Sequence, residues 1–412
     1  MKINVGFDKL DKIMHIADIH IRNYQRHREY RHIFRKLYKE VDKLPENAII
    51  YVGGDIVHNK TDISPELIDL TSEFFKRLAD KRHTIVITGN HDTNLNNSSR
   101  MDSLSPIIDN LNHPQLHYLK DSAVYEIADT HFAVFSIFDD PETFIKADSF
   151  DAKTKIALFH GPVNSSTTDI GFKVSNDDLK VSMFSGYDLA LLGDIHKHQF
   201  LDKKKRIHYV GSLIQQNFGE AFNGHGYTLW DVEKRKHNFV QLDNDYGYYT
   251  VDVIDGKLPD ITNIPKYPRV RIRTENTTQA GLKKVIAQIK RKCKTSDIVT
   301  IKKDNISNTG ENRKARSLTK DTRDVNYQNR LIDDYLTRNF SIETDVLNRI
   351  KNINRTLNQS LTNVAVSRHI NWKPKLFKFS NMFSYGTDNS VDFSKPKGVV
   401  GLFAKNHMGK SA

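Results

Sequence analysis

The sequence predicts an α/β fold from strand-like runs that alternate with helical patterns. Short, nearly continuous apolar runs are typical of strands covered on both faces, and they lie at residues 12–17, 48–52, 84–88, 155–159 and 188–192. Between the first three runs, residues 29–44 and 65–79 place apolar side chains three or four positions apart, which predicts two amphipathic helices. The second begins with Ser64-Pro65, a typical helix start. In such folds, sites lie beyond the carboxyl ends of the strands.

Length and composition limit the class of protein. The chain has 412 residues, 38% of them hydrophobic, which is enough for more than one core. No stretch approaches a membrane span and residues 1–8 lack a signal-like apolar segment, so we expect an intracellular protein, or a virus-encoded one acting inside its host cell. The single cysteine, Cys293, excludes an internal disulfide framework. A net charge of +12 suggests a polyanionic partner.

Changes in character along the chain predict four segments. The alternating strands and helices come first, and a shorter segment with strands and a basic amphipathic helix follows. Next come a polar linker and a stretch that reads as helical from residue 324 to 361. The final segment carries strand-like and turn-like pieces. The four segments are 1–245, 246–303, 304–371 and 372–412.

Clusters of histidine and carboxylate follow the five apolar runs. They are Asp18-Ile19-His20, Gly54-Asp55-Ile56-Val57-His58, Gly89-Asn90-His91-Asp92, His160-Gly161 and Gly193-Asp194-Ile195-His196-Lys197-His198. Oxygen ligands mixed with neutral imidazoles suit divalent ions. Such ligands can hold two metals about 3.5–4 Å apart, the arrangement used to cleave phosphoesters. Because alternate residues of an extended chain point to one side, Asp18 and His20 are expected to reach one ion, and His196 and His198 share that spacing.

This ordered series of motifs resembles the calcineurin-like metallophosphoesterase superfamily. Within it, several motifs are similar to those of SbcD-like nucleases, the nuclease subunits of DNA double-strand-break repair complexes: Ala17–Arg22, Gly54–His58, Leu158–Pro162 and Tyr209–Ser212. The resemblance covers about residues 10–300. It implies a β-sandwich flanked by helices, followed by a small α+β capping domain.

The resemblance also implies two sets of metal ligands. One metal is expected to be held by Asp18, His20, Asp55 and His198. The second is expected to be held by Asp55 as the bridging ligand, Asn90, His160 and His196. The resemblance favours manganese, whereas the spacing alone also allows iron or zinc.

Two further histidines are implied as catalytic side chains. His91 is expected to act as the general acid or as a phosphate contact, and His58 is expected to orient the phosphodiester. Asp92 and Asp194 are expected to orient ligands rather than to bind metal themselves.

A basic segment follows the predicted catalytic domain, where SbcD-like proteins place a DNA-capping domain. Residues 266–300 hold ten lysines and arginines against two acidic residues, so several DNA phosphates could be neutralised there. The alternative is an ordinary solvated helix face. The candidate DNA-binding residues are Arg269, Arg271, Arg273, Lys283, Lys284, Lys290, Arg291 and Lys292.

The last forty residues resemble the start of an SbcC-like ATPase, the usual partner of the nuclease. A strand-like run at 398–403 leads to Ala404-Lys405-Asn406-His407-Met408-Gly409-Lys410-Ser411, which departs from a P-loop only by Ala404 in place of the first glycine. The candidate nucleotide-binding residues are Asn406, Gly409, Lys410 and Ser411. The helix that completes a phosphate site is missing, so we expect a fragment of a nuclease–ATPase fusion that does not hydrolyse ATP. ATP and magnesium would bind only to a complete ATPase domain.

The sequence thus predicts a dinuclear-metal-dependent DNA exonuclease and endonuclease of recombination and double-strand-break repair. Its expected partners are DNA, an SbcC-like ATPase and a second copy of the chain, with no membrane. Two alternatives stay open. One is a phosphoesterase for a small nucleotide or a phosphoprotein, and the other is a catalytically silent DNA-binding scaffold.

Overall fold

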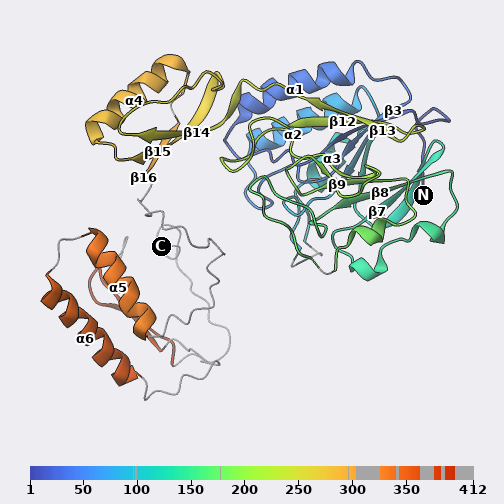
Figure 1. Ribbon diagram of the computed structural model, residues 1–412. Helices are drawn as coiled ribbons and strands as arrows, with labels where there is room; N and C mark the ends of the chain where they lie inside the picture. Colours follow the sequence, from blue (N-terminus) through green and yellow to red (C-terminus); the bar gives the residue numbers. More distant parts are fainter. Residues whose placement is uncertain are drawn as a thin grey trace. The chain divides into compact units, whose positions relative to one another are not determined.

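The computed structural model describes residues 1–95, 97, 100–176, 178–295, 297–302, 325–339, 343–361, 375–381 and 386–394. The chain divides into two compact units, Met1–Ile306 and Ser307–Ala412 (Figure 1). The finer boundaries predicted after residues 245, 303 and 371 stay predictions.

Two β-sheets form the body of the first unit. The six-stranded sheet has the order β13-β12-β2-β3-β4-β5 and consists of β2 (Lys12–Ile16), β3 (Ala48–Val52), β4 (Thr84–Ile87), β5 (Leu116–Leu119), β12 (Gly226–Asp231) and β13 (Lys236–Gln241). The seven-stranded sheet has the order β1-β6-β7-β8-β9-β11-β10 and consists of β1 (Lys2–Ile3), β6 (Ala123–Ile127), β7 (Thr130–Phe135), β8 (Thr154–His160), β9 (Leu189–Gly193), β10 (Gln199–Phe200) and β11 (Ile207–Tyr209). The five strands expected from the sequence are therefore shared between the sheets, with β2, β3 and β4 in one and β8 and β9 in the other.

The two sheets pack face to face because their central strands are apolar on both sides. In β3, Ile49 and Tyr51 point into the layer between the sheets, where they meet Trp230 and Leu158. The alternate β3 residues, Ile50 and Val52, belong to a second core on the opposite face. All five residues of β3 are buried, as expected for a strand that is covered on both faces. The predicted α/β architecture is confirmed.

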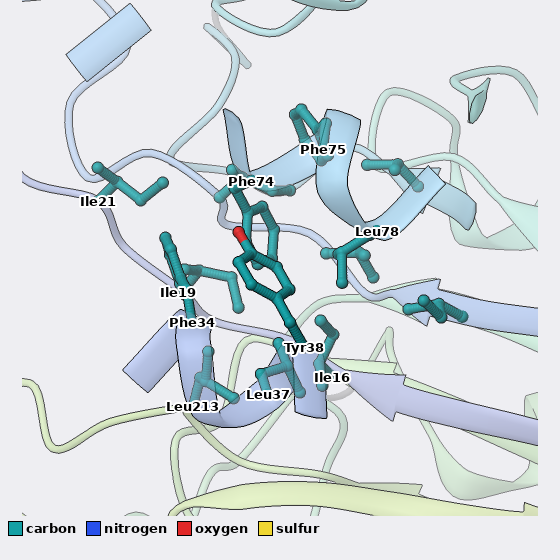
Figure 2. Close-up of a cluster of buried hydrophobic side chains, with 14 of the residues drawn as sticks. Ile16, Ile19, Ile21, Phe34, Leu37, Tyr38, Phe74, Phe75, Leu78 and Leu213 are labelled. Carbon is teal, nitrogen blue, oxygen red and sulfur yellow. The ribbon is translucent and has the colours of Figure 1, made fainter. Parts of the chain in front are cut away.

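Helices cover the outer face of the six-stranded sheet. They are α1 (His27–Val41), α2 (Pro65–Ala79) and α3 (Ser105–Leu111). Figure 2 shows Phe34 and Tyr38 of α1 packed against Phe74 of α2, with the Phe34 and Phe74 ring centroids 4.4 Å apart. Ser64 caps α2 by accepting a hydrogen bond from the Leu67 amide, which confirms the expected helix start. Short 3₁₀ turns cover the other sheet: Pro141–Thr143, Ala147–Ser149 and Val181–Phe184.

A small parallel sheet follows within the same unit. Its strands are β14 (Tyr246–Ile254), β15 (Tyr267–Glu275) and β16 (Ile298–Lys302), in that order. Helix α4 (Gln279–Lys292) packs on this sheet through Val285 and Ile289, which join a core with Val253 and Ile272. The opposite face of α4 is exposed to solvent and strongly basic.

The second unit contains α5 (Val325–Asn339), α6 (Thr344–Leu361), and an antiparallel pair of strands, β17 (Leu376–Phe379) and β18 (Asn389–Asp392). The stretch predicted to be helical, 324–361, contains these two helices. Polar contacts join them, including the Lys351–Asp333 salt bridge at 2.9 Å and a hydrogen bond from Asn354 to Asn329. Among the described helices, none is both long enough and apolar enough to cross a membrane.

The aromatic contact between α1 and α2 generates a stability prediction. Replacing Phe74 with alanine is expected to lower the free energy of unfolding by about 3–5 kcal/mol, because a fully buried ring leaves a cavity. Urea unfolding followed by tryptophan fluorescence measures the change. Ile68→Ala on the exposed side of the same helix is the control, with an expected loss below about 1 kcal/mol. Equal losses in the two variants would contradict this account of the core.

Candidate metal centre

Strained loops at the strand ends bring the candidate ligands together. Asp18 and His20 follow β2 with φ values of 53° and 50°, and Asp55 follows β3 with φ 55°. Asp194, just after β9, has φ 100°. These conformations cost energy in residues other than glycine, and such strain concentrates at functional sites. The expectation that Asp18 and His20 lie in extended chain is wrong, because both residues adopt left-handed conformations.

The first group of ligand atoms comes from Asp18, His20 and His196, which lie within 4.8 Å of one another. The Nε2 atoms of His20 and His196 are 2.9 Å apart. Two imidazole nitrogens bound at a right angle to one ion, each at about 2.1 Å, lie about 3.0 Å apart. The geometry of this pair therefore fits a shared metal ion.

Glu220 fixes the orientation of His196. Its carboxylate accepts a hydrogen bond from His196 Nδ1 at 2.8 Å and another from the Gln216 amide at 2.7 Å. A carboxylate partner at Nδ1 leaves Nε2 free to bind a metal. Burial lowers the pKa of His196, but the hydrogen bond to Glu220 and the negative charges of Asp18, Glu220 and Asp55 together outweigh burial and raise the pKa to about 9.

The second group surrounds His160, the last residue of β8. His160 Nδ1 donates to the Gly53 carbonyl at 2.7 Å, so its Nε2 carries a free lone pair. This Nε2 faces the side-chain amide of Asn90 at 3.0 Å, Asp55 Oδ1 at 3.3 Å and Asp194 Oδ1 at 3.8 Å. The Asn90 side-chain nitrogen can donate to this lone pair, whereas the carboxylates of Asp55 and Asp194 are acceptors like the lone pair itself and are satisfied by a cation between them.

Gly54 makes this close approach possible. It has φ 87°, and a Cβ atom at this position would lie 2.5 Å from His160 Nδ1. Any larger residue would displace the ring of His160 or the backbone of the loop.

Asp55 lies between the two groups. Its Oδ1 is 3.3 Å from His160 Nε2, and its Oδ2 is 3.5 Å from His20 Nε2. Burial alone raises the pKa of Asp55, but the positive fields of His160 and His20 hold the pKa well below its usual range. One carboxylate that reaches both ligand groups has the geometry of a bridging ligand.

The structure corrects the roles expected for His196 and His198. His196 lies with Asp18 and His20, the place expected for His198. The His198 ring instead packs 4.2 Å from the ring of Phe239, and its Nδ1 lies 3.1 Å from His208 Nε2. The chain bends after β9, so alternate residues there do not share a face.

Asp194, which was expected to orient ligands, lies at the position beside His160 that was expected for His196. Its carboxylate faces His160, and its backbone amide donates to Asp18 Oδ1 at 3.0 Å. The sequence carried a signal for this arrangement, because Asp194-Ile195-His196 repeats Asp18-Ile19-His20. Asp92, in contrast, points away from the centre and accepts hydrogen bonds from the Ile56, Val57 and Gly89 amides.

His58 and His91 stack beside the first group, with ring centroids 5.3 Å apart. His91 Nδ1 donates to the His58 carbonyl at 2.8 Å, which leaves His91 Nε2 for another partner. His58 Nε2 lies 3.1 Å from a guanidinium nitrogen of Arg22. Burial and then the Arg22 charge lower the pKa of His58 to about 4. Arg22, which follows Asp18-Ile19-His20 in sequence, was missed as a candidate.

The predicted DNA-binding residues separate into two sets. Three arginines on β15 have partners within the chain: Arg269 pairs with buried Glu29 at 2.9 Å, Arg271 donates to Thr250, and Arg273 pairs with Asp252 at 2.6 Å. The basic side chains of α4 are exposed, and they are Lys283, Lys284, Lys290, Arg291 and Lys292. The P-loop candidates Asn406, Gly409, Lys410 and Ser411 lie outside the described residues.

The family of the first unit can now be stated. Residues 11–198 match the family described as calcineurin-like phosphoesterase. The chain therefore carries a calcineurin-like metallophosphoesterase domain. Members of this family are metal-dependent hydrolases with a dinuclear metal site, and the clustered His and Asp side chains of this domain provide candidate ligands.

Relatives of this chain include a viral protein. Over 422 aligned residues the chain is 38% identical to the uncharacterized protein R555 of Acanthamoeba polyphaga mimivirus, with 97% of this chain and 31% of that protein covered. The chain thus spans about a third of the length of this relative.

Both a nuclease and a phosphatase appear among similar solved structures. The nuclease MPE of Pseudomonas putida is 12% identical with a TM-score of 0.26, over 55% of this chain and 87% of that one. A serine/threonine phosphatase of Saccharomyces cerevisiae with similarity to human phosphatase PP5 is 13% identical with a TM-score of 0.26, over 51% and 69% of the two chains.

The contact between Glu220 and His196 generates a prediction about metal affinity. Glu220→Gln is expected to weaken Mn²⁺ binding about 10- to 100-fold, because His196 loses the carboxylate that orients its ring. Isothermal titration of the metal-free protein measures the affinity. The control is Glu233→Gln, a change at an exposed residue that pairs with Lys9. An unchanged affinity in Glu220→Gln would rule out this role.

The corrected ligand roles generate a second prediction. Asp194→Ala is expected to retain fewer Mn²⁺ ions per chain after dialysis than the unmodified protein, because one group loses an oxygen ligand. His198→Ala is expected to retain as many as the unmodified protein, since its ring packs against Phe239. Elemental analysis measures the Mn²⁺ content of each dialysed variant and so distinguishes the two ligand assignments. Circular dichroism spectra equal to that of the unmodified protein show that the variants are folded. Loss of metal in His198→Ala alone would restore the original assignment.

Proposed function

We propose that this chain is a dinuclear-metal-dependent DNA nuclease that acts as exonuclease and endonuclease in recombination and double-strand-break repair. The observation that carries the proposal is the exposed basic face of α4 in the same compact unit as the metallophosphoesterase domain. Exposed lysines and arginines without committed partners bind phosphates regardless of base sequence. A hydrolase for a small monoester has no use for such a face.

The two ligand groups fit a pair of divalent cations, and we propose manganese because the resemblance to SbcD-like nucleases favours it. Bound there, such cations supply Lewis-acid polarisation of the phosphodiester and acidify water. The chain itself contributes the positions of its ligands. Asp55 reaches both groups, Glu220 orients His196, and the Gly53 carbonyl orients His160.

His58 and Arg22 are placed to hold the phosphate. Since His58 Nε2 faces the Arg22 guanidinium, which only donates, the ring proton of neutral His58 lies on Nδ1. This Nδ1 is buried and has no partner among the described residues, so a contact with a phosphate oxygen requires the His58 ring to turn when the substrate binds. The Arg22 guanidinium adds a positive charge beside it.

His91 is placed to act on the leaving oxygen. The His58 carbonyl accepts from Nδ1, and the His91 backbone amide donates to Asp55 Oδ1 at 2.8 Å. These contacts fix the orientation of the His91 ring, with Nε2 pointing away from the His58 carbonyl. A protonated Nε2 in this position can donate to the departing 3′ oxygen, the role of a general acid.

The surface beside the centre is open, which suits a polymer. A cavity of 360 Å³ is lined by Asp194, His196 and Glu220 together with Ile170 and Phe172. Ile170 is 77% exposed and Phe172 is 63% exposed. Exposed apolar side chains beside a catalytic centre provide surfaces on which unpaired bases can stack.

Partnership with an SbcC-like ATPase is part of the proposal. The P-loop-like residues 404–411 support it, and so do apolar side chains on the helices of the second unit, where Leu331 is 49% and Ile353 59% exposed. Exposed apolar patches mark interaction sites. A homodimer and an intracellular location belong to the same proposal.

The second candidate is a phosphoesterase that acts on a small nucleotide or a phosphoprotein. A phosphatase among the similar structures is the observation that keeps this candidate open. The basic face of α4 favours DNA instead.

Cleavage assays separate these functions. The purified chain with Mn²⁺ is expected to cleave both end-labelled duplex DNA and bis-p-nitrophenyl phosphate, and chelation of the metal is expected to abolish both activities. His91→Ala is expected to lower the rate of DNA cleavage about 10²- to 10⁴-fold with its metal content retained. Cleavage of the small ester without any cleavage of DNA would defeat the nuclease proposal. An unimpaired His91→Ala would remove the general acid.

A further inference from the structure

The outer face of α1 borders a cavity that the metal centre does not use. Arg28, Arg31, His32 and Arg35 are spaced three, four and seven positions apart, so they share one side of the helix. The cavity has a volume of 560 Å³, and α2 and the first residues of β14 and β15 complete its walls. This size is ordinary for a ligand site.

Positive charge dominates this cavity. Its walls carry four arginines, the fourth being Arg77, against the carboxylates of Glu73 and Asp245. Arg28 and Arg35 are exposed, and neither forms a salt bridge within the described parts of the chain. Among the residues that the structure describes, the Arg35 side chain donates only to the Arg31 carbonyl, at 3.2 Å. Exposed guanidinium groups that form no salt bridge are suited to phosphate groups, which they can bind through two parallel hydrogen bonds.

Aromatic rings stand beside these arginines. Tyr246 and Tyr267, which face each other at the start of β14 and β15, stack with ring centroids 4.8 Å apart. The His32 ring lies edge-on to Tyr246, at 6.0 Å. Arginines that alternate with stacking aromatic rings are the combination by which proteins hold unpaired nucleotides.

A second cavity extends the first toward the metal centre. It has a volume of 480 Å³ and shares Arg28 and Tyr246 with the first cavity. Tyr24 lines its other end and is 71% exposed. Tyr24 lies two residues after Arg22, whose guanidinium contacts His58 beside the metal ligands.

The second cavity also holds Glu66 and Glu29, the latter paired with Arg26 and Arg269, so Arg28 is its arginine without a salt bridge among the described residues. The two cavities together form one path along α1 with exposed arginines and aromatic rings, which we call the α1 track.

We propose that the α1 track binds a single strand of nucleic acid, with phosphates on Arg28 and Arg35 and bases stacked on Tyr24 and Tyr246. The direction of the strand, toward the metal centre, rests on the proposed nuclease function. The binding itself does not, because no residue of the track is a metal ligand. A paired duplex hides its base faces and would leave the tyrosines unused.

Fluorescence anisotropy with a labelled 20-nucleotide oligothymidylate tests the track. Binding to the full chain is measured in EDTA over a series of salt concentrations. Arg28→Ala/Arg35→Ala is expected to lower the slope of log affinity against log salt by about 1.4, since each single-strand phosphate contact contributes about 0.7. Tyr24→Ala is expected to weaken binding about fivefold or more through the loss of base stacking.

Lys203→Ala/Lys204→Ala is the matched control. It removes the same charge from exposed residues in the turn between β10 and β11, and it is expected to leave binding nearly unchanged. Hydrolysis of bis-p-nitrophenyl phosphate with Mn²⁺, retained in all three variants, shows that the first unit is folded.

Three results would overturn the proposal. One is an equal change of salt slope in the track variant and the lysine control. Another is normal oligothymidylate binding by Tyr24→Ala, which would mean that bases are not contacted. The third combines two observations: the arginine variant loses heparin affinity and oligothymidylate affinity equally, and the unmodified chain binds duplex as tightly as single strand. Together these observations would indicate a general polyanion surface. Failure of the nuclease proposal is distinguishable, because wild-type chain would then bind the strand in EDTA yet leave DNA intact with Mn²⁺.

Discussion

Three buried or nearly buried carboxylates, Asp18, Asp55 and Asp194, converge between the carboxyl ends of the two sheets, and the rest of the first unit holds them there. Like charges at this depth repel one another, and burial raises the pKa of Asp18 to about 7 in the absence of a cation. Bound cations offset the repulsion between the carboxylates by supplying positive charge. The strained loops, the glycine beneath His160 and the hydrogen bond from Asp194 to Asp18 are the structural consequences of holding such a cluster.

A buried ion pair joins the small parallel sheet to the two-sheet body of the first unit. Glu29 of α1 accepts hydrogen bonds from Arg26 and from Arg269 of β15, and it is almost fully buried. Arg26 also donates to the Gln215 carbonyl, at 2.6 Å. The backbone amide of the next residue, Gln216, donates to Glu220, and Glu220 orients His196. A continuous series of polar contacts thus runs from the basic domain to a candidate metal ligand. Arg269, a candidate DNA contact in the sequence, is committed to this joint.

Much of the architecture could be predicted because it depends on local pattern. An unbroken apolar run such as residues 48–52 has few alternatives to a strand covered on both faces, and Ser64-Pro65 satisfies the free amides at a helix start. The pairing of sheets could not be predicted so easily. Nothing in the runs themselves assigns β2, β3 and β4 to one sheet and β8 and β9 to the other, because sheet membership depends on long-range pairing.

The sequence by itself determined which kinds of side chain are available to the centre and in what order, since Asp, Asn and His at strand ends limit the chemistry to divalent metals. Only the tertiary structure decided which of them meet. His196 and Asp194 enter the ligand groups while His198 packs on Phe239, because the backbone bends after β9 and abandons the two-residue alternation of a strand. The same holds for charge. The sequence shows how many arginines there are, but folding decided that Arg269 of β15 pairs with Glu29 of α1 while Arg28 and Arg35 stay in solvent, because only a folded chain brings Glu29 to β15.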